Sequence, residues 1–97
     1  MKFEVRLVPS ADKDLDHYGA REQAIILESI ATFLGTDANV ETKKRKPLRP
    51  NPLAPWELRI GEYRVFYEVR EPTLVRVLAV GHKDHNELFI RGQRIEI

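Results

Sequence analysis

Two arginines flanking a tight turn are the first residues of this 97-residue chain that could do chemistry. Arg59 and Arg64 lie on either side of residues 60–63, where a two-residue loop with glycine first is typical of a type II′ β-hairpin. That turn would place the two arginines directly opposite each other, which costs a few tenths to about 1 kcal/mol. A bound phosphate could offset this repulsion, because its oxygens match guanidinium groups in pairs. Nearby carboxylates could offset it equally well: Glu57, Glu62 or Glu68.

A second group of chemically capable residues follows in the segment 81–85, which contains His82, Lys83 and His85. Metal-free RNA cleavage needs help for the attacking 2′-OH, cations beside the phosphorane and an acid for the leaving 5′-oxygen. Histidine suits proton transfer near neutral pH, and lysine adds positive charge. The alternative is that both histidines are ordinary loop residues. We expect no metal site, because the only adjacent hard ligand is Asp84 and the chain lacks cysteine.

The charge of the chain is balanced overall but unevenly distributed. Its 16 basic and 15 acidic residues give a formal net charge of +1. The segment 42–49 nevertheless carries five cations and no anion: Lys43, Lys44, Arg45, Lys46 and Arg49. Such a local patch could bind RNA or phosphate even in a nearly neutral protein. It could also be a solvated loop whose charges offset acidic helices.

Length and composition limit the class of protein. With 97 residues we expect a single domain over residues 1–97, and 42% apolar with 32% charged residues is typical of a soluble globular protein. The absence of cysteine excludes disulfides and suits a reducing cytosol. No run of about 18 apolar residues and no signal-peptide pattern is present. We therefore expect a cytoplasmic protein that needs no membrane and no cofactor.

Hydrophobic periodicity predicts two helices in the first half of the chain. A half-buried strand is expected over residues 3–8, and a short helix over 11–17 with Ser10 as its N-cap. A longer helix should follow over 20–34 and end at Gly35. Its apolar side chains fall on one stripe, at Ile26, Ile30, Phe33 and Leu34.

The second half is predicted to be a sheet. Four prolines make residues 36–55 an irregular connection, and three strands follow at about 56–60, 63–69 and 73–80. The order β-α-α-β-β-β is an α+β fold, with helices on one face of a mainly antiparallel sheet and the other face open for function. The tail after residue 80 is ambiguous, with a weak edge strand at 94–97. The predicted core comprises Ile26, Ile30, Phe33, Leu58, Val65, Tyr67, Val77 and Leu78.

Three segments carry a family resemblance. Residues 58–67 read Leu-Arg-Ile-Gly-Glu-Tyr-Arg-Val-Phe-Tyr, residues 80–83 read Val-Gly-His-Lys, and residues 8–15 read Val-Pro-Ser-Ala-Asp-Lys-Asp-Leu. Together they resemble the RelE/ParE superfamily of toxins from type II toxin–antitoxin systems. The resemblance implies two N-terminal helices on an antiparallel sheet. It also implies either a ribosome-dependent mRNA endonuclease, which the residues above favour, or a gyrase inhibitor or catalytically weak antitoxin-binding regulator.

The resemblance also implies roles for individual residues. Arg64 matches the arginine that holds the scissile phosphate, and Lys83 falls where a second cation follows the Val-Gly pair. Phe89 falls at the position of the family's catalytic tyrosine and lacks its hydroxyl, so His82 or His85 would have to act as the acid. The implied partners are a cognate antitoxin, in a complex that can be of higher order, and the ribosome with its mRNA. We expect the antitoxin to be acidic where it meets the paired arginines.

Overall fold

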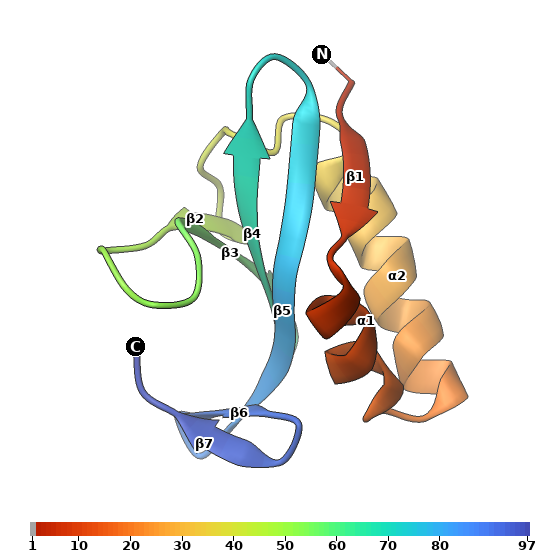
Figure 1. The fold of residues 1–97 in the computed structure, drawn as a ribbon, viewed down its shortest axis with the longest axis vertical. Coiled ribbons are helices and arrows are strands. Elements are labelled where there is room, and N and C mark those ends of the chain that lie inside the picture. Colours follow the sequence, from red (N-terminus) through yellow and green to blue (C-terminus); the bar gives the residue numbers. More distant parts are fainter. Residues whose placement is uncertain (1) are drawn as a thin grey trace.

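The computed structural model describes residues 2–97 as two helices packed on one face of a sheet (Figure 1). This confirms the predicted α+β class. The elements in chain order are β1 (Glu4–Leu7), α1 (Pro9–Asp16), α2 (Ala20–Leu34), β2 (Arg45–Pro47), β3 (Trp56–Ile60), β4 (Tyr63–Arg70), β5 (Leu74–Asp84), β6 (Glu87–Ile90) and β7 (Gln93–Ile95). Within these residues, no helix has the length and apolar character needed to cross a membrane.

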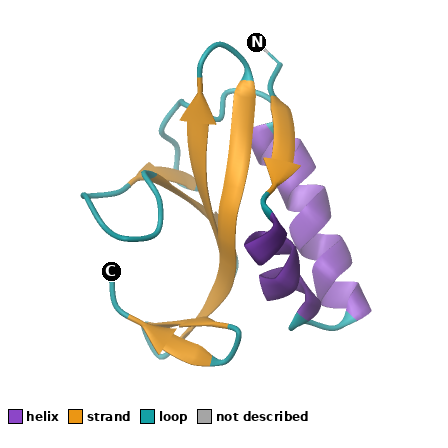
Figure 2. Cartoon of the chain, viewed as in Figure 1, coloured by secondary structure: helices purple, strands orange, loops and turns teal. Residues whose placement is uncertain are grey.

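The sheet runs in the order β2-β3-β4-β5-β6-β7, and β1 pairs in parallel with β5 (Figure 2). The predicted order β-α-α-β-β-β is confirmed by β1, α1, α2, β3, β4 and β5. The expectation that 36–55 lacks regular structure was wrong at β2, whose Pro47 is tolerated because β2 is an edge strand. The ambiguous tail forms the short hairpin β6–β7.

The helices start and stop largely where local chemistry predicts. The bounds of α2 agree with the predicted range, and Gly35 follows it because a Cβ there would lie 2.6 Å from the carbonyl oxygen of Ala31. The assignment of Ser10 as N-cap was wrong. Helix α1 begins at Pro9, with Val8 as its N-cap, because proline has no N–H to satisfy and its φ suits the first helical turn.

Two apolar clusters lie on the two faces of the sheet. The main core between helices and sheet includes all the predicted residues except two. Phe33 is half-buried and packs against that core. Leu78 instead belongs to a second cluster on the opposite face, around the fully buried Phe66. The prediction that this face is open was therefore wrong there, because the segment 48–54 and the β6–β7 hairpin cover Phe66.

A β-bulge at Leu78 explains this residue's position. Phe66 pairs with Ala79 and Tyr67 pairs with Val77, so Leu78 is an extra residue without a partner on β4. Beyond the bulge the alternation of β5 is shifted by one, because successive side chains of a strand point to opposite faces. Val80 consequently joins the main core beneath the helices, while Leu78 and Ala79 both pack in the second cluster.

Candidate functional site

The predicted hairpin register is confirmed, and Arg59 lies directly opposite Arg64. The turn starts at Gly61 with φ +57°, a conformation that glycine adopts without strain. Glu57 is buried at 4% exposure and lies beside both guanidinium groups. Its carboxylate is 2.9 Å from Nε of Arg59 and 3.9 Å from Nε of Arg64. The two arginines thus share one buried carboxylate. Of the two ways to offset their repulsion, a bound phosphate or a nearby carboxylate, the structure contains the carboxylate of Glu57.

Arg64 is held firmly in place. Its Nη1 donates hydrogen bonds to the carbonyl oxygens of Gly61 (2.7 Å) and Tyr63 (2.9 Å), and its side chain is only 15% exposed. Burial lowers the pKa of Arg64, while the charge of Glu57 opposes that shift. The side chain of Arg59 is half exposed by comparison. Arg64 is therefore a preorganised cation, and Arg59 is the more accessible of the pair.

Two further cations share a face with these arginines. Gly81 pairs with Arg64, so Lys83, two residues on, lies on that face as well. Lys46 of β2 pairs with Glu57 and joins the same face, where it also forms a 3.6 Å ion pair with Glu41. We call this set, Lys46, Arg59, Arg64 and Lys83, the cationic face. A surface of this kind can bind phosphates or acidic side chains.

His82 lies on the other side of the sheet. It pairs with Tyr63, a residue packed against the main core, and its Nδ1 is 2.6 Å from the hydroxyl of Tyr18 at the end of the helical hairpin. The ring of Phe89 stacks on it with centroids 5.7 Å apart and planes at 20°. His82 and Phe89 are thus brought together, but on the helix side and away from Arg64 and Lys83.

A hydrogen-bonded aromatic group surrounds His82. The hydroxyl of Tyr63 donates to Oε2 of Glu22 (2.6 Å), and the rings of Tyr18 and Tyr63 meet edge to face with centroids 5.6 Å apart. Burial, followed by the nearby Tyr63, Glu22 and Asp14, raises the pKa of Tyr18 to about 12. Tyr18 therefore keeps its proton at neutral pH. Tyr18 and Glu22 were not predicted, because no local pattern links them to a strand some 60 residues away.

His85 is separate from both groups. It lies in the turn between β5 and β6 with φ +50°, and its side chain is 93% exposed. Its Nδ1 is 2.8 Å from Oδ1 of the neighbouring Asp84. Among residues 2–97 there is no group of three histidine, aspartate or glutamate side chains placed to hold a metal ion.

The basic segment has a structural part and an exposed part. Arg45 donates to the carbonyl oxygens of Phe33 (2.9 Å) and Val40 (3.0 Å), so it anchors the segment to the end of α2. The ammonium group of Lys44 lies 5.3 Å from the centre of the Phe33 ring. Lys43 and Arg49 are exposed. Lys43, Lys44 and Arg49 thus remain candidates for phosphate contacts. The hydrogen bonds of Arg45 within the protein explain that residue without a phosphate contact.

Comparison with known proteins places this geometry in a family. Residues 5–87 match the family model described as the ParE toxin of the type II toxin–antitoxin system parDE. A chain of the toxin–antitoxin complex RelBE2 from Mycobacterium tuberculosis superposes with a TM-score of 0.70 at 27% identity, covering 86% of this chain and 100% of that one. A chain of the archaeal RelE–RelB complex from Pyrococcus horikoshii gives 0.67 at 20% identity, covering 88% and 99%. No curated protein matches.

Fold and family match together define a toxin of the type II toxin–antitoxin class, with the RelE/ParE architecture. Within that class, the chain belongs to the ParE toxin family. The match ends at residue 87, where β6 begins, so nearly all of the β6–β7 hairpin lies beyond the part that the family model describes.

Proposed function

We propose that this toxin acts in the cytoplasm by binding its target through the cationic face, rather than by cutting RNA. The observation that carries this proposal is the position of His82 and Phe89 on the opposite side of the sheet from Arg64 and Lys83. Cleavage would require an acid and the stabilising cations to meet at one phosphate. Binding requires only the cations, and the β3–β4 hairpin holds two of them, Arg59 and Arg64, beside Glu57.

The target that best fits a ParE-family toxin is DNA gyrase, as the resemblance to this superfamily implies. The cationic face offers guanidinium groups that suit acidic side chains or the phosphates of gyrase-bound DNA. Arg59 is the accessible contact, and Arg64 fixes its surroundings through the shared carboxylate of Glu57.

A ribosome-dependent mRNA endonuclease is the second candidate. It is favoured by one observation, that Arg64 and Lys83 share a face as the family resemblance requires of phosphate-binding residues. In that case the mRNA phosphate would lie against these cations, and the proton for the leaving oxygen would come from the ribosome or from His85. No metal or cofactor takes part in this scheme.

A cognate antitoxin completes the proposal, since the two solved structures compared above are toxin–antitoxin complexes. An acidic segment of the antitoxin would neutralise Arg59 and Lys46 and thereby block the face that the target needs. The same contacts could assemble several toxin and antitoxin chains into a larger complex.

Induction of the toxin in bacterial cells separates the two candidates. We expect plasmid supercoiling to relax before amino-acid incorporation falls, and purified ribosomes with mRNA to remain uncut. Arg64→Ala should abolish growth arrest, whereas Arg6→Ala, a similarly charged but 71% exposed arginine on β1, should not. Cleavage of ribosome-bound mRNA with unchanged supercoiling would instead establish the endonuclease. If Arg64→Ala remained fully toxic, the cationic face would be needed neither for gyrase binding nor for mRNA cleavage.

A further inference from the structure

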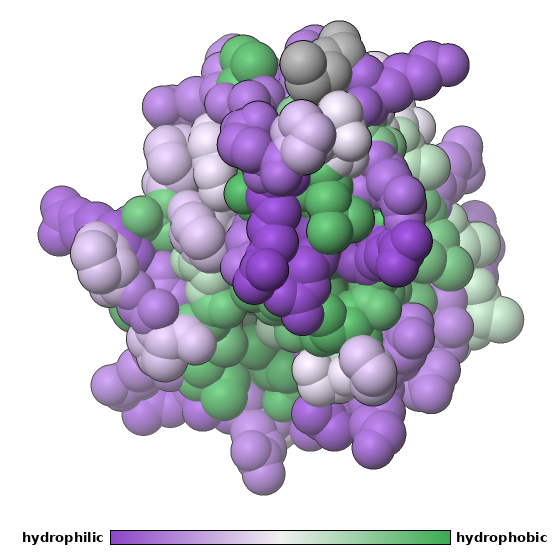
Figure 3. Space-filling model, turned by 45° about the horizontal axis from the view of Figure 1, so that its top comes forward, coloured by the Kyte–Doolittle hydropathy of each residue, from purple (hydrophilic) through white to green (hydrophobic). Residues whose placement is uncertain are grey.

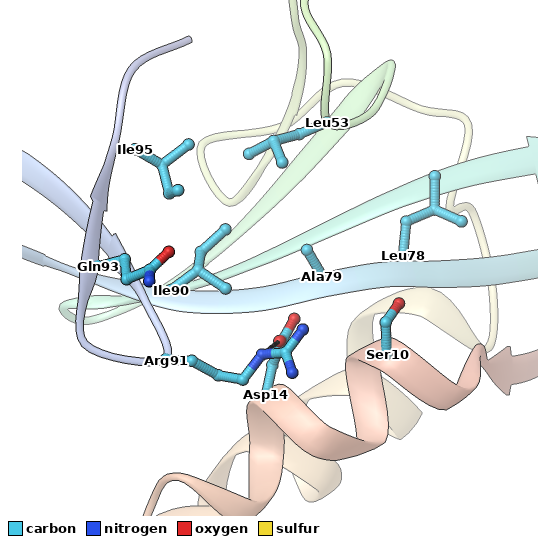
Figure 4. Close-up of a pocket in the computed structure, with 9 residues that line it drawn as sticks. All are labelled: Ser10, Asp14, Leu53, Leu78, Ala79, Ile90, Arg91, Gln93 and Ile95. Carbon is cyan, nitrogen blue, oxygen red and sulfur yellow. Dashed lines mark ion pairs between the residues drawn. The ribbon is translucent and has the colours of Figure 1, made fainter.

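A pocket of about 470 Å³ lies beside β5 where the second cluster meets α1, on the same side of the sheet as the cationic face. Apolar side chains form much of its lining, together with the polar Ser10, Asp14, Arg91 and Gln93. Figure 3 shows that apolar residues also gather at the surface of the molecule, between polar ones. Leu78 and Ala79 of β5 line one side, and Leu53, Ile90 and Ile95 line the other (Figure 4). A second pocket of about 410 Å³ shares Leu53 and Leu78 with it, so the two pockets are neighbours.

The floor of this pocket contains a buried carboxylate. Asp14 of α1 is 2% exposed, and its Oδ2 accepts a hydrogen bond from the backbone N–H of Val80 (3.0 Å). That N–H faces a gap in the sheet, because pairing with β1 ends at Val77 and pairing with β6 begins at His82. Asp14 therefore replaces a missing strand at this point. A buried charge of this kind needs a counter-charge.

The counter-charge comes from Arg91, whose Nε lies 2.7 Å from Oδ1 of Asp14 (Figure 4). The approach is not aligned as a hydrogen bond, and Oδ1 has no hydrogen-bond partner among the described residues. Arg91 sits at the turn of the β6–β7 hairpin with φ +50°, and its side chain is 49% exposed. The carboxylate is thus fixed, whereas its cation is on the surface and could be replaced.

We propose that this pocket binds a segment of the antitoxin in which an arginine or lysine lies between branched apolar side chains. The basic group of that segment replaces Arg91 as the ion-pair partner of Asp14. The apolar side chains on either side of it pack against Leu53, Ile90 and Ile95. A carboxylate can accept a pair of hydrogen bonds from one guanidinium group. Arg91 does not form such a pair with Asp14, so Oδ1 is still able to accept a hydrogen bond. The neighbouring second pocket gives the segment a place to continue past Leu78. This inference rests on the proposed toxin function, because it names a second contact for the same partner.

Short peptides test the proposal without requiring the antitoxin itself. The purified chain, uniformly ¹⁵N-labelled, is titrated with acetyl-Leu-Arg-Leu-amide and with acetyl-Leu-Gln-Leu-amide. We expect the arginine peptide to shift the backbone amides of Val80, Ala79 and Ile90, with at least ~10-fold tighter binding than the glutamine peptide. Asp14→Asn, which still offers an oxygen to the Val80 N–H, should remove that difference.

A competition variant makes the test sharper. Arg91→Gln removes the internal cation, so it should strengthen binding of the arginine peptide, whereas Arg94→Gln on the same hairpin should leave it unchanged. Equal binding of both peptides, or no shift in this pocket for wild type and Arg91→Gln alike, would overturn the proposal. Toxicity in cells is scored separately: a toxin that kills but binds neither peptide refutes only this site. A chain that binds the arginine peptide but is not toxic refutes the proposed function instead.

Discussion

The hydroxyl of Tyr18 lies 2.6 Å from Nδ1 of His82 and ties the end of the helical hairpin to the end of β5. The two residues are 64 positions apart in the chain, so the contact exists only in the folded protein. Because Tyr18 keeps its proton at neutral pH, the bond persists whichever tautomer the imidazole adopts.

Removing this hydroxyl should weaken the fold measurably. Tyr18→Phe keeps the ring packing and loses one hydrogen bond, so we expect the free energy of unfolding to fall by about 0.5–1.5 kcal/mol. Urea denaturation of Tyr18→Phe, His82→Phe and the double variant gives the coupling between the two groups. Strictly additive effects would mean that the contact contributes nothing to stability.

The shared carboxylate of Glu57 should matter more than any exposed ion pair. Glu57→Gln leaves two opposed guanidinium groups without their buried anion, and we expect a loss of about 1–3 kcal/mol. Glu96→Gln, at an exposed pair with Arg94, should change stability by less than about 0.5 kcal/mol. Urea denaturation measures the free energy of unfolding of both variants. If the two variants lost similar amounts, Glu57 would not be the residue that offsets the repulsion between the two arginines.

Asp14 should be the most sensitive acidic residue of α1. Asp14→Ala leaves the Val80 N–H unsatisfied inside the protein, so a loss of about 1–3 kcal/mol is expected. Amide hydrogen exchange at Val80 should also accelerate relative to its neighbours. Asp16→Ala on the same helix is exposed and serves as the matched control, with an effect within about 0.5 kcal/mol.

High pH should destabilise the protein through its buried tyrosines. The pKa of Tyr18 is raised to about 12 by burial, and burial also raises the pKa of Tyr67. A raised folded pKa means that stability is intact below the unfolded value of about 10 and is lost as pH rises toward the folded value. Urea midpoints should therefore fall from about pH 10 upward, with a smaller fall in Tyr18→Phe. An unchanged pH profile in that variant would contradict the assignment.

Low pH tests the Tyr63–Glu22 hydrogen bond. The hydroxyl of Tyr63, and then the backbone N–H of Gly19, lowers the pKa of Glu22. A lowered folded pKa gives stability that is present above the unfolded value of about 4.3 and is lost as pH falls through the folded value. Tyr63→Phe should flatten this acid limb of the stability profile. NMR titration of the Glu22 carboxyl in both proteins shows whether its pKa rises toward the ordinary value.

Phe89→Tyr distinguishes the proposed binding function from cleavage. Phe89 stacks on His82 on the helix side of the sheet, so a hydroxyl added there does not meet Arg64 and Lys83. We expect no cleavage of ribosome-bound mRNA by this variant. If the added hydroxyl produced cleavage, the endonuclease would become the better account of the wild-type surface.

Local patterns predicted much of this structure because their causes are local. The turn at Gly61 fixes the whole register of β3 and β4, including the Arg59–Arg64 pair, and the apolar stripe of α2 fixes its buried face. The cover over Phe66 was missed because it comes from the irregular segment 48–54 and from the tail, which carry weak periodicity. The partners of His82 were missed because they depend on how α1 docks against β5.

Leu78 is the one residue of β5 between Leu74 and His82 that has no partner on β4. This extra residue determines which face of the sheet carries His82 and which carries Lys83. With the bulge, His82 lies on the face of the sheet toward the helices, and Lys83 lies on the face that carries the two arginines. Deleting one residue there would exchange them and place a histidine among the cations without changing any amino acid in either group. In this fold, inserting or deleting one residue in β5 therefore changes which side chains a surface presents. Both evolution and protein engineering can use such a change.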